Sequence, residues 1–439
     1  MTRQIVILGA GTAGTIMANR IARAYGNQIR AGQISLTVVD EDRPHLYQPG
    51  LLFLPFGHYR PEQLVKAKTP LLPRSATYVR GAIERVEPEA AAVHLADGSA
   101  LAYDVLIIAT GSRIVPDETE GLTGAGWREK IFDFYTLDGA TALRDALAKF
   151  EGGRLVVNVV EMPIKCPVAP LEFVFLADDY FSRRGIRDKV EITYVTPLDG
   201  AFTKATCSHA LAYLLDEKRV RLVTEFATGR VDGPEGKLYA WDDTEVGFDL
   251  LVSIPAHKGA DFIARTDGLG DDMNFVYTDP QTLQAKRAAN IFVIGDATNV
   301  PASKAGSVAH FQAELLIENV KRFLAGQPIE PSFDGHANCF IETGHNRALL
   351  IDFNYELEPV HGRFPFAWGP VPLLKESRLN HLGKLFFRWI YWHVLLPGRP
   401  IPGVPARMSR VGKRASELAG PPPGPAATRA AAPSARAGV

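Results

Sequence analysis

The chain has few cysteines and no long apolar segment. Its 439 residues include only three cysteines, at positions 166, 207 and 339. Cysteines so few and so widely spaced exclude the disulfide framework of a small secreted domain. They also lack the spacing of zinc ligands, so we expect no metal site. No apolar run reaches the roughly 18–20 residues that a membrane-spanning helix needs.

Neither sign of charge is in excess. The 48 basic and 49 acidic residues leave a net charge of −1, which disfavours nucleic-acid binding. A hydrophobic content of 46% is that of a folded globular protein, and the length predicts two or three domains. An apolar strand begins at Ile5 and leaves no room for a cleavable signal peptide, so we expect synthesis in the cytoplasm.

The first 40 residues show the pattern of a dinucleotide-binding β-α-β unit. An apolar strand over residues 5–8 is followed by a glycine-rich turn, a helix-like segment and a second strand that ends at Asp40. The glycines of the turn are Gly9, Gly11 and Gly14. Such glycines let the backbone approach a pyrophosphate at the helix N-terminus, and the acid can bind a ribose hydroxyl. We therefore predict a nucleotide site here.

Two later apolar strands, over residues 104–112 and 289–297, distinguish FAD from NAD. The first ends in Ala109-Thr110-Gly111 and the second in Gly295-Asp296. Both resemble segments of the two-dinucleotide-binding-domain flavoproteins, the family that includes glutathione reductase-like enzymes. The resemblance implies FAD and places Asp296 on the ribityl and phosphate side of the flavin, where a carboxylate can accept hydrogen bonds from sugar hydroxyls.

The intervening residues 112–288 alternate strand and helix but lack a second glycine-rich turn. The expected strand at 154–160 is followed by Glu-Met-Pro-Ile-Lys-Cys-Pro, which contains no glycine. Side chains and Pro163 would obstruct the approach of a pyrophosphate to the backbone. The sequence therefore disfavours NAD(P)H as a substrate.

The segments around Cys166 and Cys339 both resemble cysteine segments of one known family. Pro163-Ile164-Lys165-Cys166, followed by Ala169-Pro170, resembles the cysteine loop of the sulfide:quinone oxidoreductases. Those enzymes have a second redox cysteine before a Thr-Gly-x-Asn-Arg stretch, and here Cys339 precedes Thr343-Gly344-His345-Asn346-Arg347. The resemblance extends from residue 1 to about residue 400.

The resemblance implies roles for individual residues. Cys166 and Cys339 would form the redox pair, although each cysteine taken alone is more often a small buried apolar residue. Glu172 is the candidate proton acceptor, and its position six residues after Cys166 also resembles the flavocytochrome c sulfide dehydrogenases. The remaining expectations are a thiol pKa lowered by a nearby cation such as Lys165 or by a base, a flavin-facing cation at Lys304 and a structural role for Cys207.

Residues 379–396 have the composition of a helix in a membrane interface. Their apolar side chains at helical spacing are Leu382, Leu385, Phe386, Trp389 and Ile390, interleaved with Lys384 and Arg388. The alternative is a helix that packs on the protein itself or in a dimer interface. From Gly420 onward the chain is rich in proline and alanine, and we expect disorder there.

We therefore expect an α/β protein with two Rossmann-like three-layer domains of the glutathione reductase-like type, plus C-terminal amphipathic helices that associate with a membrane. The expected FAD-binding domain comprises residues 1–111 and 289–330, and the second domain comprises residues 112–288. A C-terminal domain over 331–418 and a tail over 419–439 complete the division.

The predicted function is FAD-dependent oxidation of sulfide to persulfide or polysulfide sulfur, with electrons passed to a lipid quinone. The protein would bind the cell membrane peripherally, and a homo-oligomer is left open. Three alternatives remain: a type II NADH:quinone dehydrogenase, a flavocytochrome c-like sulfide dehydrogenase, and a flavoprotein that senses redox state or carries sulfur without turning over quinone.

Overall fold

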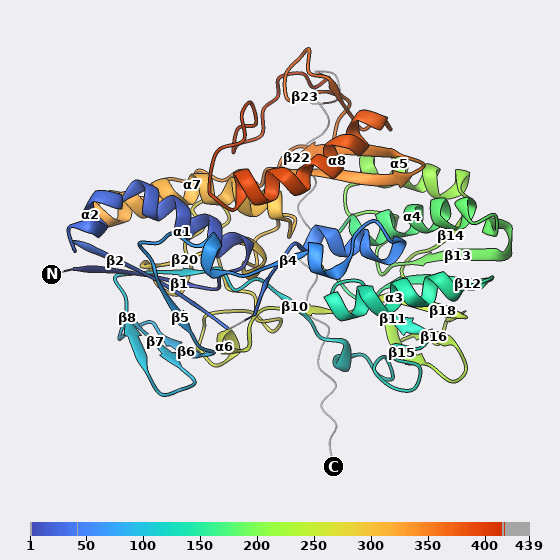
Figure 1. The fold of residues 1–439 in the computed structure, drawn as a ribbon, viewed down its shortest axis with the longest axis horizontal. Helices are drawn as coiled ribbons and strands as arrows, with labels where there is room; N and C mark the ends of the chain where they lie inside the picture. The colour runs from blue at the N-terminus through green and yellow to red at the C-terminus, as the bar shows by residue number, and fades with distance from the viewer. Residues whose placement is uncertain (1, 42, 415–416, 418–439) are drawn as a thin grey trace.

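The computed structural model describes residues 2–41, 43–414 and 417. Two five-stranded parallel sheets lie side by side, with helices along one side of both (Figure 1). The first sheet has the order β20-β9-β1-β2-β5. Its strands are β1 (Arg3–Leu8), β2 (Ile34–Asp40), β5 (Thr77–Arg80), β9 (Val105–Ile108) and β20 (Ile291–Val293). Its helices are α1 (Thr12–Ala24), α2 (Gly26–Arg30) and α7 (Gly306–Leu324).

The second sheet has the order β11-β18-β12-β13-β14, and all of its pairings are parallel. Its strands are β11 (Ile131–Phe132), β12 (Gly153–Val159), β13 (Val190–Val195), β14 (Val220–Val223) and β18 (Leu250–Ile254). Its helices are α3 (Leu137–Lys149), α4 (Ala169–Arg183) and α5 (Ala205–Glu217). Helices cover one face of each sheet and a small antiparallel sheet packs against the other, so both faces are apolar, as in parallel sheets generally. The predicted α/β fold with Rossmann-like parallel sheets is thus confirmed.

Smaller antiparallel sheets complete each half. One contains β6 (Ile83–Glu87), β7 (Ala92–Leu95) and β8 (Ala100–Ala102), and the other contains β15 (Thr228–Asp232), β16 (Lys237–Ala240) and β17 (Glu245–Gly247). The two chain segments that connect the halves pair with each other as β10 (Arg113–Ile114) and β19 (His257–Lys258). Short pieces elsewhere are β3 (His45–Leu46), β4 (Val65–Lys66) and α6 (Asp261–Ala264).

The C-terminal part lies over the junction of the two halves (Figure 1). A hairpin of β21 (Ala337–Gly344) and β22 (Arg347–Phe353) packs against α4, and α8 (Arg378–Ile390) packs against the hairpin. The two hairpin-turn residues, His345 and Asn346, both have positive φ, as a tight hairpin between right-twisted strands requires. This part also contains β23 (Gly362–Phe364) and β24 (Val371–Leu373).

The observed elements are shorter than expected where the chain turns toward the site. The strand expected over 104–112 ends at Ile108, and the strand expected over 289–297 ends at Val293. In both cases a glycine of positive φ follows within three residues, Gly111 at 69° and Gly295 at 72°, and an extended strand cannot continue through this left-handed backbone. The helix expected over 379–396 ends as α8 at Ile390 and continues as one π-helical turn.

No helix in the described part of the chain is long and apolar enough to cross a membrane. The disorder expected from Gly420 onward concerns residues outside the described ones. The domain boundaries at 111, 288 and 330 remain predictions.

Candidate active site

One cavity of about 400 Å³ lies where the two halves and the C-terminal part meet. It is bordered by the glycine-rich turn after β1, the loop after β12, the hairpin strand β21 and the inner side of α8. Its size is in the range of ligand pockets in proteins. Cavities of this kind form at the carboxyl ends of parallel strands, which is where β1 and β12 end.

Of the three glycines in the turn, one faces open space where a ligand can approach. The other two lie so close to neighbouring backbone that a side chain would not fit. A Cβ on Gly14 would lie 1.8 Å from the carbonyl oxygen of Gly9, and a Cβ on Gly9 would lie 2.6 Å from that of Ala109. At Gly11, which lines the cavity, a Cβ would meet no described heavy atom within 4 Å. The turn therefore offers an open backbone surface beside the N-terminus of α1.

Asp40 lies at the end of β2, as predicted, and is already engaged. Its carboxylate accepts a hydrogen bond of 2.7 Å from the backbone N–H of Ala10 and pairs with the ammonium of Lys68 at 2.5 Å. The first contact fixes the turn, and the second balances the charge. Lys68 was not predicted, because its segment carries no recognisable motif.

Thr110 and Ser112 present polar atoms to the same cavity. Their hydroxyl oxygens are buried and have no hydrogen-bond partner within the described chain. Buried polar groups are rarely left unpaired, so these atoms fit a polar ligand in the cavity. Gly111 between them has nothing within 4 Å of a built Cβ among the described residues.

Asp296 and Lys304 also line this cavity. The Lys304 ammonium donates hydrogen bonds to the backbone oxygens of Asp296 and Thr298, at 2.9 and 2.7 Å, and lies 3.8 Å from the centre of the Phe275 ring. Burial lowers the pKa of Lys304 to about 8. The side chain is therefore part of the cavity wall, unlike a solvated surface lysine. The glycine surface, the open hydroxyls, Asp296 and this cation together fit the phosphates, hydroxyls and polar ring edge of FAD.

The loop after β12 places Cys166 beside this pocket. Its backbone N–H donates to the carbonyl oxygen of Lys304 at 2.7 Å, and the Tyr135 hydroxyl donates to that of Lys165 at 2.9 Å. Cys166 has a φ of 48°, a left-handed conformation that is uncommon for residues other than glycine. Such outliers concentrate at functional sites, where surrounding contacts hold them.

Cys339 reaches the same cavity from β21, although the two cysteines are far apart in the sequence. The connection is α4, which begins at Ala169 just after Cys166 and packs against β21. All three cysteines of the chain are described, and all three are free thiols. Cys207 is completely buried on α5 and is not among the described residues that line the cavity.

Glu172 lies one turn into α4 and is completely buried. Its Oε1 accepts a hydrogen bond of 2.8 Å from the backbone N–H of Glu342 and pairs at 2.7 Å with the ammonium of Lys384. Its Oε2 has no hydrogen-bond partner among the residues described. Burial raises the pKa of Glu172, and the Lys384 charge opposes that rise. A carboxylate with one open oxygen in a cavity can accept a proton.

Lys384 is the main site residue that the sequence did not reveal. From the sequence, Lys384 is only one of two basic residues interleaved with the apolar side chains of the expected interfacial helix. Its ammonium points inward to Glu172 and to the carbonyl oxygen of Phe340, at 2.9 Å. The signal was present in the polar spacing along the helix, because Ser377, His381 and Lys384 follow one another at one-turn intervals.

Both cavity thiols have raised pKa values. Burial raises the pKa of Cys339 to about 12, and it raises that of Cys166 further; the charge of Glu172 adds to both effects, and that of Lys384 opposes them. The expected activation by Lys165 is wrong. That ammonium points away from the thiols and donates to the carbonyl oxygen of Ser112 at 3.1 Å. The cation that acts on both thiols is Lys384.

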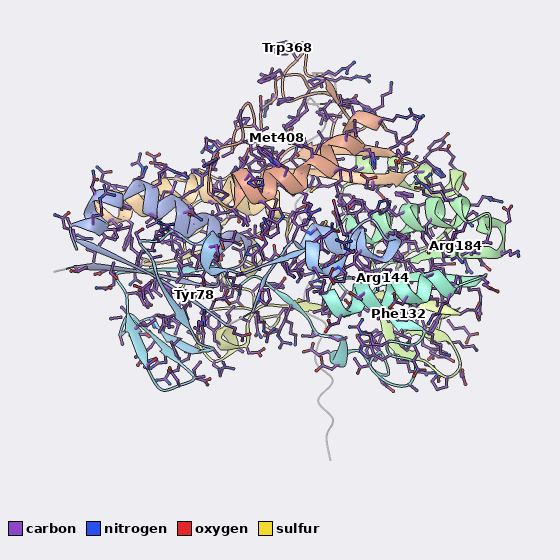
Figure 2. The ribbon with its side chains drawn as sticks, viewed as in Figure 1. Tyr78, Phe132, Arg144, Arg184, Trp368 and Met408 are labelled. Atoms are coloured by element: carbon purple, nitrogen blue, oxygen red, sulfur yellow. The ribbon has the colours of Figure 1, made fainter. Side chains whose placement is uncertain are left out.

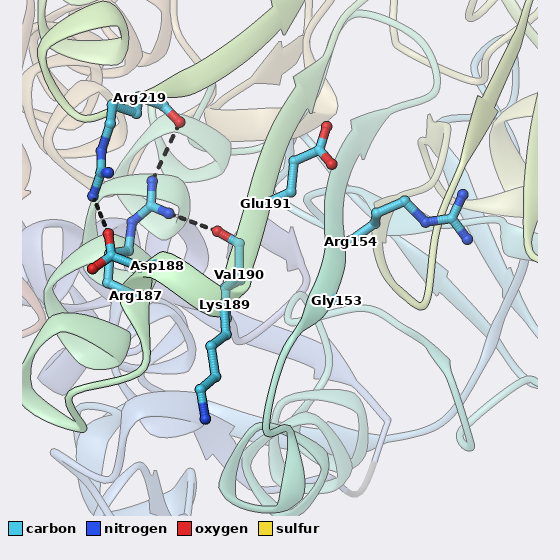
Figure 3. A pocket seen from close by; sticks show the side chains of 8 residues that line it. All are labelled: Gly153, Arg154, Arg187, Asp188, Lys189, Val190, Glu191 and Arg219. Carbon is cyan, nitrogen blue, oxygen red and sulfur yellow. Dashed lines mark hydrogen bonds and ion pairs between the residues drawn. The ribbon is translucent and has the colours of Figure 1, made fainter.

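A second groove at the amino ends of β12 and β13 is charged but internally paired (Figure 3). Arg187 binds Asp178 at 2.7 Å and the carbonyl oxygen of Val190 at 2.6 Å, and Arg219 pairs with Asp188 at 2.9 Å. Because its three arginines all have carboxylate partners, this groove offers little to an anionic ligand. The cysteine cavity remains the candidate active site.

Comparison with known proteins places this cavity in context. A family model described as "Pyridine nucleotide-disulphide oxidoreductase" matches residues 3–159. The chain is 28% identical over 404 residues to the mitochondrial sulfide:quinone oxidoreductase of Dictyostelium discoideum, covering 90% of this chain and 86% of that one. It is 26% identical over 402 residues to the mouse enzyme, with the same coverage. The predicted resemblance to this family is thus confirmed.

Solved structures show the same fold. The sulfide:quinone oxidoreductase of Aquifex aeolicus superposes with a TM-score of 0.74 at 19% identity, covering 91% of this chain and 92% of that chain. An NAD-dependent persulfide reductase from A. fulgidus superposes with a TM-score of 0.58 at 18% identity, covering 80% of this chain and 64% of that chain.

Proposed function

We propose that this protein, given its similarity to the sulfide:quinone oxidoreductases, oxidises sulfide and passes the electrons through FAD to a quinone. The observation that carries the proposal is the meeting of Cys166 and Cys339 at one cavity, beside a surface that fits FAD. Neither cysteine alone would support it. Together they provide a dithiol that a two-electron acceptor can oxidise to a disulfide.

The chemistry of the pair is thiol–disulfide exchange. Hydrosulfide attacks one sulfur of the Cys166–Cys339 disulfide, forming a persulfide on that cysteine and releasing the other as a thiolate. Transfer of the outer sulfur to a thiol or sulfide acceptor leaves two reduced cysteines. Bound FAD supplies the two-electron oxidation that restores the disulfide, and delivers those electrons to quinone.

Glu172 accepts the proton of the incoming sulfide in this proposal. Its open Oε2 and its position on the cavity wall suit that task. Burial raises its pKa and makes it a stronger base than an exposed glutamate, and the Lys384 charge favours its ionised form. Asp296 and Lys304 would hold FAD, and the Lys304 cation would favour a negatively charged reduced flavin.

The remaining wall of the cavity is apolar and suits a quinone. It is lined from the C-terminal part by Phe364, Phe386, Phe387, Ile390, Ile401 and Val404. An aromatic and aliphatic lining of this kind buries a quinone ring and the start of an isoprenoid chain. This apolar wall lies next to α8, whose outer side faces away from the protein (Figure 1).

We also propose that this outer side rests on a membrane surface. The exposed apolar side chains of α8 are Leu379, Leu382, Phe386 and Trp389. Trp368, which is 81% exposed, stacks on Phe366 in the loop that projects beyond the helix (Figure 2). Contiguous exposed apolar surface of this kind marks a membrane or protein contact. A membrane contact there would place the apolar cavity wall within reach of a lipid quinone.

The type II NADH:quinone dehydrogenase alternative is disfavoured by the loop after β12. Where such an enzyme needs glycines against a pyrophosphate, this chain has Pro163, buried Ile164 and the thiol of Cys166. The flavocytochrome c alternative would use a cytochrome and has no need of an exposed apolar helix.

The deciding experiment is a turnover assay with sulfide and a short-chain quinone under anaerobic conditions. The flavin-loaded protein should reduce quinone only when sulfide is present. Cys166→Ser and Cys339→Ser should each abolish this turnover while FAD remains bound. Full turnover in either serine variant would refute the cysteine mechanism, and an absence of turnover in the unmodified protein would refute the function itself.

A further inference from the structure

Lys384 connects α8 to the cysteine site through buried polar contacts. Its side chain is 12% exposed, and its ammonium binds Glu172 and the carbonyl oxygen of Phe340, the residue next to Cys339. Lys384, Glu172, Cys166 and Cys339 all line the same cavity. No metal or cofactor contact is needed to explain the position of the lysine. It is fixed by the carboxylate and by the strand that carries the second cysteine.

A charge pair beside two thiols acts on their protonation with opposite signs. A carboxylate near a thiol disfavours the thiolate, and an ammonium near it favours the thiolate. Glu172 and Lys384 both act on Cys166 and on Cys339 in this way. Removing one partner therefore leaves the other to act alone in a buried, low-dielectric site, where its effect is larger than in water.

We propose that the Glu172–Lys384 pair sets the reactivity of the two cysteines. Lys384 is the positioning residue: its positive charge balances the carboxylate of Glu172 and so favours the formation of the two thiolates. The inference deepens the proposed function, because it concerns the cysteines that react with sulfide there. Lys384 is a positioning residue since it acts on the sulfurs through its charge and through Glu172.

Neighbouring groups do not duplicate this cation. Glu342 is the next acid along the buried strand, and it is paired with His381 at 3.0 Å, which leaves Lys384 for Glu172. The other titratable or charged groups that act on these residues are Tyr135, Tyr47, Cys207 and Asp352. Each of these is neutral or negative when it titrates, so none of them favours a thiolate.

The test is the rate of cysteine alkylation in the flavin-loaded protein. The cysteines are first reduced with a phosphine without oxygen, and iodoacetamide labelling of each cysteine is followed by mass spectrometry from pH 6 to pH 10. Below its pKa a thiol reacts in proportion to its thiolate fraction, so one pKa unit changes the rate about tenfold. Lys384→Met should slow labelling of Cys166 and Cys339 about tenfold, and Glu172→Gln should accelerate it about tenfold.

The double variant and two controls make the test specific. Lys384→Met combined with Glu172→Gln should label close to the unmodified rate, and Lys384→Arg should retain it. Arg388→Met is the matched control, because Arg388 lies one turn further along α8, donates to the carbonyl oxygen of Gln63 and should leave the rates unchanged. Shifts of the same sign in Lys384→Met and Glu172→Gln would overturn the proposal.

Buried Cys207 reports on folding in the same spectra. If Lys384→Met exposes Cys207 to labelling, Glu172→Gln and Lys384→Arg decide the question: no acceleration in the first, or slow labelling in the second, overturns the proposal. The assay contains neither sulfide nor quinone. If the proposed function fails, the alkylation rates can therefore still be measured. If the charge-pair inference fails, sulfide turnover should still be observed.

Discussion

At the residue scale, the glycines of the first turn have two different tasks that single substitutions can separate. Gly14 and Gly9 are needed by the protein, because added Cβ atoms would meet backbone oxygens. Gly11 is free of such contacts and faces the cavity, so it is needed only by a ligand that approaches there. A glycine motif alone does not reveal this division, since all three positions look alike in the sequence.

Gly11→Ala should therefore lower FAD occupancy and leave the FAD-free protein as stable as before. Gly14→Ala should prevent folding or cost more than about 4 kcal/mol, because backbone cannot yield as a flexible side chain can. Flavin absorbance per protein and thermal unfolding of the FAD-free proteins provide the two measurements. Equal loss of stability in both variants would contradict the assignment of Gly11 to the ligand.

Glu172→Gln should lower sulfide turnover by about 100-fold or more, the effect expected on losing a general base. The pH profile gives a second check. Because burial raises the pKa of Glu172, the acid limb of kcat/KM for hydrosulfide should lie above the ordinary glutamate value of 4.5. Activity should fall as the pH falls through that raised pKa. In Glu172→Gln this limb should disappear, and a limb that persists unchanged would assign it to another group.

At the element scale, α8 differs from an ordinary surface helix, whose exposed side is polar. Its inner side combines Asn380, His381 and Lys384, which hydrogen-bond to the rest of the protein, with the apolar residues Phe387 and Ile390 that line the cavity. Its outer side is apolar and exposed. The sequence predicted an apolar stripe, of which Leu382, Phe386 and Trp389 are exposed, whereas Leu385 and Ile390 pack against the core. It did not predict that the polar residues point into the protein, because spacing alone cannot tell which side of a helix faces the core.

Leu382→Gln and Trp389→Ser should weaken binding to lipid vesicles without lowering the melting temperature. Each loses about 1.5–3 kcal/mol of apolar burial in the membrane, so the partition coefficient should fall about tenfold or more. Trp241→Ser is the matched control, because Trp241 is 79% exposed on the second half and should not contact lipid. Equal vesicle binding by all three variants and the unmodified protein would remove α8 as the membrane contact.

The segment after α8 is anchored to β22 by a buried ion pair. Lys413 binds Asp352 at 2.6 Å, and both side chains are almost completely buried. Asp352 also binds His336 at 2.7 Å. Burial acts to raise the pKa of Asp352, but His336 and Lys413 together hold it below its ordinary value of 3.8. This anchor keeps Ile401 and Val404 at the cavity wall.

Lys413→Met should destabilise the protein by about 3–5 kcal/mol, because it leaves a buried carboxylate without its cation. Arg410→Met removes an exposed pair and should change the free energy of unfolding by less than about 0.5 kcal/mol. Asp352 has a depressed pKa in the folded state, so its contribution is present above 3.8 and is lost as the pH falls through the folded-state pKa. The difference between unmodified protein and Lys413→Met should shrink in unfolding measurements below pH 4, and a constant difference would contradict this.

At the scale of the whole molecule, local patterns predicted the fold and the cofactor side of the site. The strand, glycine turn and helix after Ile5 are contiguous, so their geometry follows from their sequence. The pairing of Cys166 with Cys339 came from resemblance, since only the packing of α4 on the hairpin brings them together. The partners of Glu172 could not be predicted, because Lys384 belongs to a helix that is distant in the chain.

The same distance explains why the electrostatic expectation was wrong. Lys165 is adjacent to Cys166 in sequence, but its ammonium donates to the carbonyl oxygen of Ser112, and its charge is not among those of the described residues that act on either thiol. Lys384 acts on both thiols from a helix that lies 218 positions after Cys166 (384 − 166) and 45 after Cys339 (384 − 339). The effect of a charge on a thiol depends on the distance between them in space, and the order of residues in the sequence does not give that distance.

The most direct test of the central claim is an anaerobic titration of the flavin-loaded protein, monitored by flavin absorbance. Sulfide should bleach the flavin with two electrons per FAD, and NADH at the same concentration should leave it oxidised. Addition of a short-chain quinone should then restore the oxidised spectrum. Bleaching by NADH, together with no response to sulfide, would contradict the account and favour an NADH dehydrogenase.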